Sequence, residues 1–284
     1  MNTRQWQPIG VFDSGIGGLT VLRAIHHLMP DEPLIYLADQ AHVPYGPRTL
    51  EEVRQFSEVI TRFLLDQGAR LVVVACNAAS AAALKYLRTI FPGVPFVGME
   101  PAVKPAAEHT HTGVVGVLAT PATFQGELYA SVVERFGKGV KLLQNTCPGL
   151  VGQIEKGEFE GSETRRILEE ALHPMLTKGI DTVVLGCTHY PFVIPLIQLI
   201  AGPQVRVIDP APAVARQVQR LLVASDLLEM ETMAQQAIPP HPLHLMQFFT
   251  TGNTAMLQRL LPGWLGEIAP VERLEWKSGR LISV

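Results

Sequence analysis

Hydrophobic residues in this chain form short runs that alternate with longer amphipathic segments. Segments such as Leu50–Leu65 and Glu163–Leu176 carry apolar residues at helical spacing. Strands and helices in regular alternation predict βαβ units and a mostly parallel sheet. The runs expected to form strands are Ile9–Phe12, Leu34–Ala38, Leu71–Ala75, Pro95–Gly98, Val114–Leu118, Val140–Leu143, Val183–Gly186 and Val205–Ile208.

Two of these runs have nearly the same sequence. Residues 71–80 read LVVVACNAAS, and residues 182–191 read TVVLGCTHYP. Because neither run alternates with polar residues, each predicts a strand buried on both faces, and each stops at a cysteine, Cys76 or Cys187. In open α/β sheets, chemistry gathers beyond the carboxyl ends of the strands. The pattern therefore predicts a pocket that receives one thiol from each run.

The similarity between the two halves extends beyond the cysteines. Residues 97–103 (VGMEPAV) match residues 207–214 (VIDPAPAV), and the repeated segments lie about 106 to 111 residues apart. We therefore expect two similar, mostly parallel α/β domains related by an internal duplication, with the active site in the cleft between them. The expected division is 1–98 plus 210–284 for the first domain and 99–209 for the second.

The segment beyond Pro210 has no counterpart in the middle of the chain. It predicts a long helix, a proline-rich break at Ile238–Pro242, a strand near Leu245–Phe249 and a capped helix after Gly252. We expect this tail to return to the first domain and complete it.

Composition narrows the class of protein. A chain of 284 residues, 47% hydrophobic and 17% charged, can bury a large core. A net charge of -3 provides no basic surface for nucleic acid, and no run reaches the roughly 18 apolar residues of a membrane span. The first residues lack the apolar stretch of an export signal, and three cysteines without CxxC spacing fit a reducing compartment. We expect a cytoplasmic protein that acts on a small molecule, without nucleic acid or membrane partners; a homodimer stays open.

Acidic and polar residues are expected beside the first cysteine. In a sheet of order 2-1-3-4 the first strand lies beside the third, which brings Asp13 and Ser14 next to Cys76 and Asn77. A carboxylate disfavours a neighbouring thiolate, so Asp13 would either take the thiol proton or keep the thiol protonated. Both roles suit proton transfer.

The glycine-rich segment Ser14–Gly18 precedes a predicted helix. Its free backbone N–H groups suit an anion such as a carboxylate. The dinucleotide fingerprint is incomplete, because Thr20 stands where the third glycine would be, and Asp13 would repel a pyrophosphate. A dinucleotide cofactor is therefore disfavoured.

The second cysteine is followed by a histidine in Cys187-Thr188-His189. The imidazole could deprotonate the thiol or stabilise the thiolate. A metal site would need further ligands at a suitable spacing, and none is visible, so no metal is expected. Cys147 has no polar partner nearby in the sequence and is expected to be inert.

The loop Asp39–Gly46 follows the second predicted strand. Its proline and glycine are typical of a turn. Because it leaves the carboxyl end of a strand, Tyr45 and Gly46 could close over a ligand.

Taken together and in order, several motifs resemble the glutamate racemases of the cofactor-independent aspartate/glutamate racemase family. The resemblance runs from about Gly10 to Ala211, and TTG at 250–252 is similar to the family's C-terminal segment. The motifs are DSGIGGLT at 13–20, PYG at 44–46, ACN at 75–77, TPAT at 120–123 and LGCTHYP at 185–191.

This resemblance implies a cofactor-free racemase that supplies D-glutamate for peptidoglycan synthesis. Cys76 would take the α-proton from D-glutamate and Cys187 that from L-glutamate, on opposite faces. Asp13 would assist Cys76, while His189 and Glu155 would assist Cys187. The implied substrate-binding residues are Asp13, Ser14, Tyr45, Gly46, Asn77, Ala78, Thr120, Thr123, Thr188 and His189.

Two positions depart from the family's pattern. Ala78 follows Asn77 where a threonine is usual, and Gly126 stands where a serine is usual. Neither change removes a proton-transfer group, but both bear on affinity and on the choice between glutamate and aspartate.

Two other classes of function remain open on the residues alone. A thiol hydrolase or amidase would use one cysteine as nucleophile, and the second cysteine would be dispensable. A two-lobed ligand-binding protein would need neither cysteine and more often carries an export signal.

Overall fold

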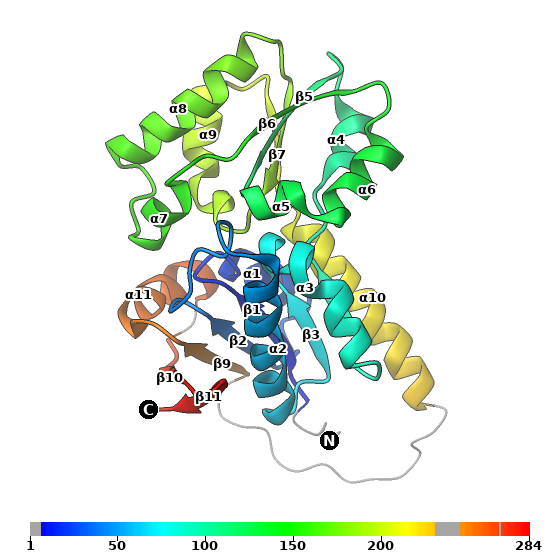
Figure 1. Ribbon diagram of the computed structural model, residues 1–284, viewed down its shortest axis with the longest axis vertical. Helices are drawn as coiled ribbons and strands as arrows, with labels where there is room; N and C mark the ends of the chain where they lie inside the picture. The colour runs from blue at the N-terminus through cyan, green and yellow to red at the C-terminus, as the bar shows by residue number, and fades with distance from the viewer. Residues whose placement is uncertain (1–6, 231–244, 267) are drawn as a thin grey trace.

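The protein has two lobes, each built on its own β-sheet with helices packed around it (Figure 1). The computed structural model describes residues 7–230, 245–266 and 268–284. The chain passes from the first sheet to the second after β4 and returns after β8, where α10 (Ala211–Met230) packs against α1 (Leu19–Leu28) of the first lobe. The α/β class predicted from the sequence is confirmed.

The first sheet has the order β11-β10-β9-β2-β1-β3-β4. Neighbouring strands are parallel except in the C-terminal hairpin β10–β11. The strands are β1 (Ile9–Asp13), β2 (Leu34–Ala38), β3 (Leu71–Val74), β4 (Phe96–Gly98), β9 (Met246–Thr250), β10 (Val271–Lys277) and β11 (Arg280–Ser283).

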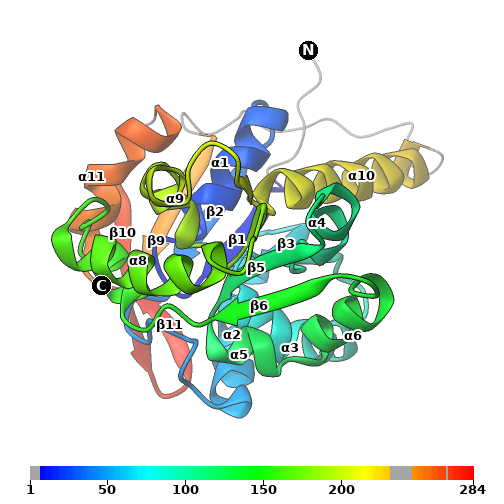
Figure 2. The same cartoon turned by 90° about the horizontal axis from the view of Figure 1, so that it is seen from above.

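The second sheet, all parallel, has the order β6-β5-β7-β8. Figure 2 shows two of its strands, β5 and β6, side by side. Its strands are β5 (Val114–Ala119), β6 (Lys141–Asn145), β7 (Thr182–Gly186) and β8 (Arg206–Ile208). Taken in chain order, this sheet repeats the 2-1-3-4 arrangement of β2-β1-β3-β4 in the first. The topology supports the internal duplication that the sequence indicates.

Helices connect the strands in both lobes. α2 starts with a capping box, in which the Thr49 hydroxyl accepts the N–H of Glu52 and the Glu52 carboxylate accepts the N–H of Thr49. The remaining helices are α2 (Leu50–Asp66), α3 (Asn77–Ile90), α4 (Val103–His109), α5 (Pro121–Gln125), α6 (Glu127–Phe136), α7 (Leu150–Glu155), α8 (Ser162–Leu176), α9 (Ile194–Ala201) and α11 (Thr254–Leu265), with a 3-10 turn η1 (Tyr190–Val193).

The predicted C-terminal tail returns to the first sheet as expected, because β9 pairs in parallel with β2. α10 and α11 match the two predicted helices, while the break expected at 238–242 lies outside the described residues. The hairpin β10–β11 was not predicted from the sequence. In β10 two exposed residues separate the buried Val271 and Leu274, so the alternation that indicates a strand is lost.

No helix in the described part of the chain combines the length and the apolar character that a membrane span requires.

Candidate active site

A cavity between the lobes lies where the carboxyl ends of strands from both sheets meet. Most of the predicted binding residues line it, and Val151 of α7 is a lining residue that sequence reasoning missed. The signal for Val151 was its spacing of four from Glu155, which places both on one helix face. The lining residues are Ser14, Pro44, Tyr45, Gly46, Cys76, Asn77, Ala78, Thr120, Val151, Cys187, Thr188 and His189.

Two predicted binding residues, Asp13 and Thr123, are not among the lining residues but contact side chains that are. Asp13 accepts a hydrogen bond from the Thr188 hydroxyl at 2.9 Å. The Thr123 hydroxyl lies 3.2 Å from that of Thr120.

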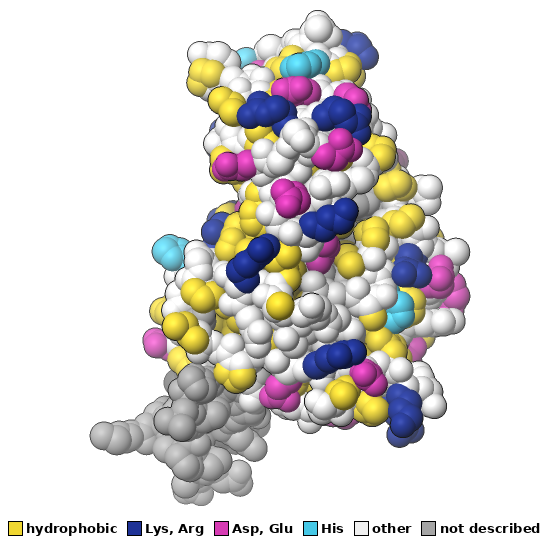
Figure 3. Space-filling model, turned by 90° about the vertical axis from the view of Figure 1, so that its left-hand side faces the viewer, with side chains coloured by type: hydrophobic (Ala, Val, Ile, Leu, Met, Phe, Trp, Pro, Cys, Tyr) yellow, Lys and Arg dark blue, Asp and Glu magenta, His cyan; other side chains and the backbone are white. Residues whose placement is uncertain are grey.

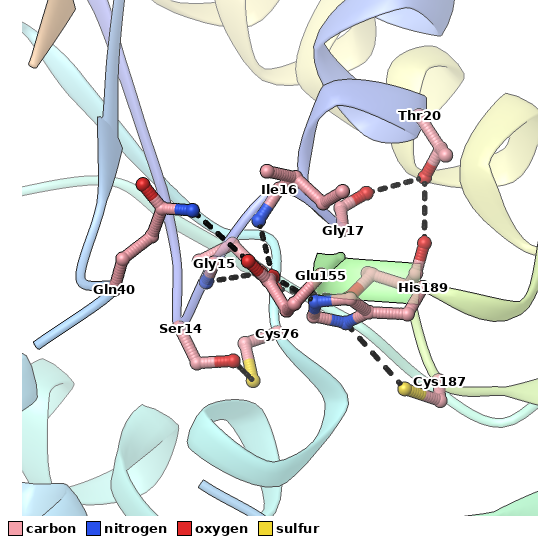
Figure 4. Close-up of polar contacts among 12 residues, drawn as sticks. Ser14, Gly15, Ile16, Gly17, Thr20, Gln40, Cys76, Glu155, Cys187 and His189 are labelled. Atoms are coloured by element: carbon pink, nitrogen blue, oxygen red, sulfur yellow. Dashed lines mark hydrogen bonds and ion pairs between the residues drawn. The ribbon is translucent and has the colours of Figure 1, made fainter. Parts of the chain in front are cut away.

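The two cysteines come from equivalent places in the two sheets and have different partners (Figure 4). Cys76 follows β3 and is the N-cap of α3, and its Sγ lies 3.9 Å from Ser14 Oγ. Cys187 follows β7, and its Sγ lies 3.8 Å from His189 Nδ1. Both thiols are free and buried. The cavity therefore receives one thiol from each lobe, as the repeated sequence predicts.

The surroundings of Cys76 favour the protonated thiol. Burial and the nearby charge of Asp13 raise the pKa of Cys76 well above its usual range. Burial also raises the pKa of Asp13, although its Oδ1 accepts the N–H of Gly15 at 2.8 Å. At neutral pH Cys76 is thus protonated, in the field of the Asp13 carboxyl group.

The surroundings of Cys187 have the opposite character. His189 Nε2 lies 2.6 Å from Glu155 Oε1. Burial opposes the charged imidazolium, but hydrogen bonds with Cys187 and Glu155 and the charges of Asp13 and Glu155 outweigh it, so the pKa of His189 is raised well above its usual range. Burial likewise opposes ionisation of Glu155, yet its hydrogen bonds, above all with His189, lower its pKa.

An imidazolium cannot accept a proton. Of the two roles left open by the sequence, His189 therefore suits the stabilisation of a thiolate at Cys187 better than its deprotonation. The cavity thus combines a thiol on one side with a partner for a thiolate on the other.

The glycine-rich segment does hold a carboxylate, and it belongs to the protein. The N–H of Ile16 donates to Glu155 Oε1 at 2.7 Å. A Cβ atom at Gly15 would lie 1.9 Å from that oxygen, and one at Gly17 would lie 2.5 Å from His189 Nδ1. These glycines are required because side chains of the second lobe approach the backbone of the first.

The loop after β2 is fixed at both of its predicted contact residues. Tyr45 lines the cavity, and its hydroxyl donates to Asp39 Oδ2 at 2.6 Å. The carbonyl of Gly46 accepts the N–H of Ala122 from the second lobe at 3.3 Å. The loop therefore closes the cavity from the side of the first lobe.

Asn77 carries an unsatisfied amide in this cavity. Its side-chain nitrogen and oxygen are buried and have no hydrogen-bond partner among the described residues. An unpaired buried amide costs about 1–3 kcal/mol, which a ligand with both a donor and an acceptor would recover. An α-amino acid, with its ammonium and carboxylate groups, has that pattern.

The cavity is small in this structure. It offers about 10 Å³ to the centre of a water molecule, which is room for about one water. An amino acid needs more room than this, so groups around the cavity must move to admit it.

Within the described ranges, His, Cys, Asp and Glu side chains form no cluster that could hold a metal ion.

Cys147 lies outside the lining residues, and burial raises its pKa to about 12. This agrees with the expectation that Cys147 is inert.

The chain also matches proteins of known family. The model of the Asp/Glu/Hydantoin racemase family matches residues 9–218. The chain belongs to this family. The resemblance to racemases inferred from the sequence motifs is therefore confirmed.

Within the racemase family, the chain is similar to several glutamate racemases. It is 51% identical to the glutamate racemase of Roseiflexus sp. (strain RS-1) over 228 residues, covering 80% of this chain and 84% of the relative. Among solved structures, Escherichia coli glutamate racemase in complex with L-glutamate and the activator UDP-MurNAc-ala has a TM-score of 0.80 at 29% identity, covering 97% and 99% of the two chains. The Francisella tularensis enzyme in complex with D-glutamate has a TM-score of 0.76 at 28% identity, covering 93% and 95%.

Proposed function

We propose that this protein interconverts L- and D-glutamate by proton transfer between two bases, Cys76 and Cys187. The observation that carries the proposal is the pair of buried thiols, one from each lobe, that line a single cavity with unlike partners. The names of its relatives support glutamate as the substrate.

In the direction from L to D, the thiolate of Cys187 takes the α-proton of L-glutamate. The C–H bonding pair stays on the α-carbon, and the thiol of Cys76 gives its proton to the opposite face. The products are D-glutamate, a thiol at Cys187 and a thiolate at Cys76. The reverse reaction exchanges the two roles, so neither direction requires an oxidant or a cofactor.

Neighbouring side chains lower the activation free energy of each proton transfer. His189, held by Glu155, stabilises the thiolate of Cys187, while the charge of Asp13 raises the pKa of Cys76 and so assists return of a proton to that sulfur. General acid and base groups of this kind contribute about 10² to 10⁴ each in rate. Hydrogen-bond donors in a site without bulk water stabilise the carbanion-like state.

The substrate is held by the polar groups that surround the thiols. Asn77 offers its unpaired amide, and Thr188 and Ser14 offer hydroxyls from the two lobes. The proposed binding set is the one given by the sequence, with Asp13 and Thr123 acting through Thr188 and Thr120. We further propose the domain division 1–98 with 210–284 and 99–209, and a cytoplasmic role in supplying D-glutamate for peptidoglycan.

The proposal is tested by incubating the protein with L-glutamate in D₂O, after dialysis against EDTA, while optical rotation and α-deuterium are followed. We expect racemisation with deuterium in the product enantiomer. Cys76→Ser and Cys187→Ser should each abolish it, whereas Cys147→Ser serves as the control and should retain it. Wild-type turnover in Cys76→Ser or Cys187→Ser would exclude the two-base mechanism and favour a single thiol nucleophile. Activity that EDTA removes and zinc restores would reveal a metal requirement.

A further inference from the structure

The Thr-Thr-Gly motif at the carboxyl end of β9 supplies no lining residue of the cavity, yet it supports the loop that follows β2. The Thr250 hydroxyl accepts the N–H of Gly252 at 3.0 Å and lies 2.8 Å from Gln40 Oε1. A Cβ atom at Gly252 would lie 2.6 Å from the Cβ of Gln40. The glycine thus allows Gln40 to lie against this turn.

The orientation of the Gln40 amide follows from its two neighbours. Gln40 Nε2 lies 3.0 Å from Glu155 Oε2. Since an ionised carboxylate only accepts hydrogen bonds, the NH₂ group of Gln40 must face Glu155 and its oxygen must face Thr250. The Thr250 hydroxyl is free to donate to that oxygen because its own acceptor side takes the N–H of Gly252.

Gln40 therefore joins the two lobes at the catalytic histidine. Glu155 belongs to α7 of the second lobe, and its Oε1 is already shared by His189 and the N–H of Ile16. Gln40, from the first lobe, is the partner that the structure records for Oε2. Figure 4 shows the four side chains Gln40, Glu155, His189 and Cys187 in succession.

We propose that Gln40 is a positioning residue for the base on the second lobe. Its amide holds the Glu155 carboxylate, and through it the His189 imidazole, in the orientation that serves Cys187. This inference rests on the proposed racemase function and deepens it. Gln40 contacts neither sulfur, and it is not among the residues that line the cavity.

The same bond links catalysis to closure of the lobes. A cavity with room for about one water cannot admit an amino acid unless the lobes separate. Because Gln40 and Glu155 stand on different lobes, separation breaks their hydrogen bond and closure restores it. The Cys187 side of the site is thus complete when the lobes are together, as they are here, and incomplete when they are apart.

The test separates the two faces of the site with the L and D forms of 3-chloroglutamate. One base removes the α-proton, the C–H electrons form the double bond as the C–Cl bond breaks, and chloride leaves; the enamine then hydrolyses to a 2-oxo acid and ammonia. In Gln40→Met, which keeps the length of the side chain but has no donor, we expect elimination from the L form to fall about tenfold, as for loss of a hydrogen bond to a charged group. Elimination from the D form, which uses Cys76, should stay within about twofold.

Gln55→Met is the matched control, because the exposed Gln55 donates to Glu51 at 3.2 Å on α2 and is not among the residues that line the cavity. It should leave both rates unchanged. Equal losses for the two forms in Gln40→Met, or no loss, would overturn the inference. If Gln40→Met fails to fold, Gln40→Glu, which keeps the shape and the acceptor for Thr250, should show the same preference for loss on the L form.

Failure of the proposed function gives a different result. If Cys187→Ser still eliminates chloride from the L form at the wild-type rate, the assignment of the bases is wrong, whatever Gln40 does. If Cys187→Ser loses the L reaction alone and Gln40→Met loses neither, the bases are right and the role of Gln40 is wrong.

Discussion

Replacing Glu155 by glutamine removes the charge at the centre of the link between the lobes while preserving its shape. The new amide oxygen can still accept from His189 Nε2 and from the N–H of Ile16, which the structure places 2.6 and 2.7 Å from Glu155 Oε1. The new NH₂ group faces Gln40, whose own amide can rotate to meet it. Glu155→Gln therefore tests the carboxylate charge more than the hydrogen-bond geometry.

The size of the effect follows from burial. Glu155 has 12% of its side chain exposed and His189 only 2%, so solvent screens their interaction weakly. A hydrogen bond to a charged group contributes about 1.5–3 kcal/mol and a neutral one about 0.5–1.5 kcal/mol. We expect Glu155→Gln to weaken stabilisation of the imidazolium and its thiolate by about 1–2 kcal/mol, which corresponds to a rate loss of about 5- to 30-fold.

Racemisation alone cannot show on which face this loss falls. The two enantiomers of glutamate have equal free energies in water, so kcat/KM must remain equal for L and D in every variant. Elimination from 3-chloroglutamate has no such constraint. In Glu155→Gln the L form should lose the full factor, while the D form, whose proton goes to Cys76, should change little.

Stability provides a second measurement with a defined pH dependence. The raised pKa of His189 means that its contribution is fully present below the unfolded pKa, about 6.5, and is lost as pH rises through the folded value. The lowered pKa of Glu155 means that its contribution is present above its unfolded pKa and is lost as pH falls. The deficit of Glu155→Gln in free energy of unfolding should thus be largest between these limits, near pH 6. A deficit independent of pH, or equal rate losses for the two chloro forms, would refute this account of the ion pair.

Two further substitutions test how closely the lobes approach. In Gly17→Ala the new Cβ would lie 2.5 Å from His189 Nδ1, so kcat/KM should fall at least about tenfold while the protein stays folded. The control is Gly263→Ala, whose new Cβ meets no atom within 4 Å and which gains helix propensity. A fully active Gly17→Ala variant would show that the lobes can adjust. Ala78→Thr restores a hydroxyl beside the unpaired amide of Asn77, and we expect KM for glutamate to fall by a modest factor with kcat changed less; an unchanged or raised KM would mean that the cavity is built around alanine.

Most of the fold could be predicted because its signals are local. Runs such as Leu34–Ala38 are buried along their whole length, and the structure forms β2 over the same residues. The 2-1-3-4 strand order, which the sequence analysis used to place Asp13 and Ser14 beside Cys76, occurs in both sheets. The hairpin β10–β11 was missed because burial along Val271–Lys277, next to the edge strand β11, does not follow a period of two.

Within the site, the sequence predicted which residues lie at the carboxyl ends of the strands, but not the contacts that these residues make. The positions of Cys76 and Cys187 follow from sheet topology, but the contacts between lobes have no sequence signature. Asp13, for example, accepts a hydrogen bond from Thr188 of the other lobe, a contact that the sequence did not indicate. The anion at the glycine-rich segment proved to be Glu155, more than a hundred residues away in the chain.

These contacts make the two halves chemically unequal, although duplication gave them the same plan. A buried carboxyl group near Cys76 favours the thiol, and an imidazolium beside Cys187 favours the thiolate. Under the proposed mechanism, the site in that state is ready for L-glutamate, and a turnover from L to D leaves it in the opposite state, ready for D-glutamate. Because kcat/KM must be equal for the two enantiomers, this inequality can appear only in kcat and KM separately. The direction with the more stable free form of the enzyme should show the lower KM and the lower kcat.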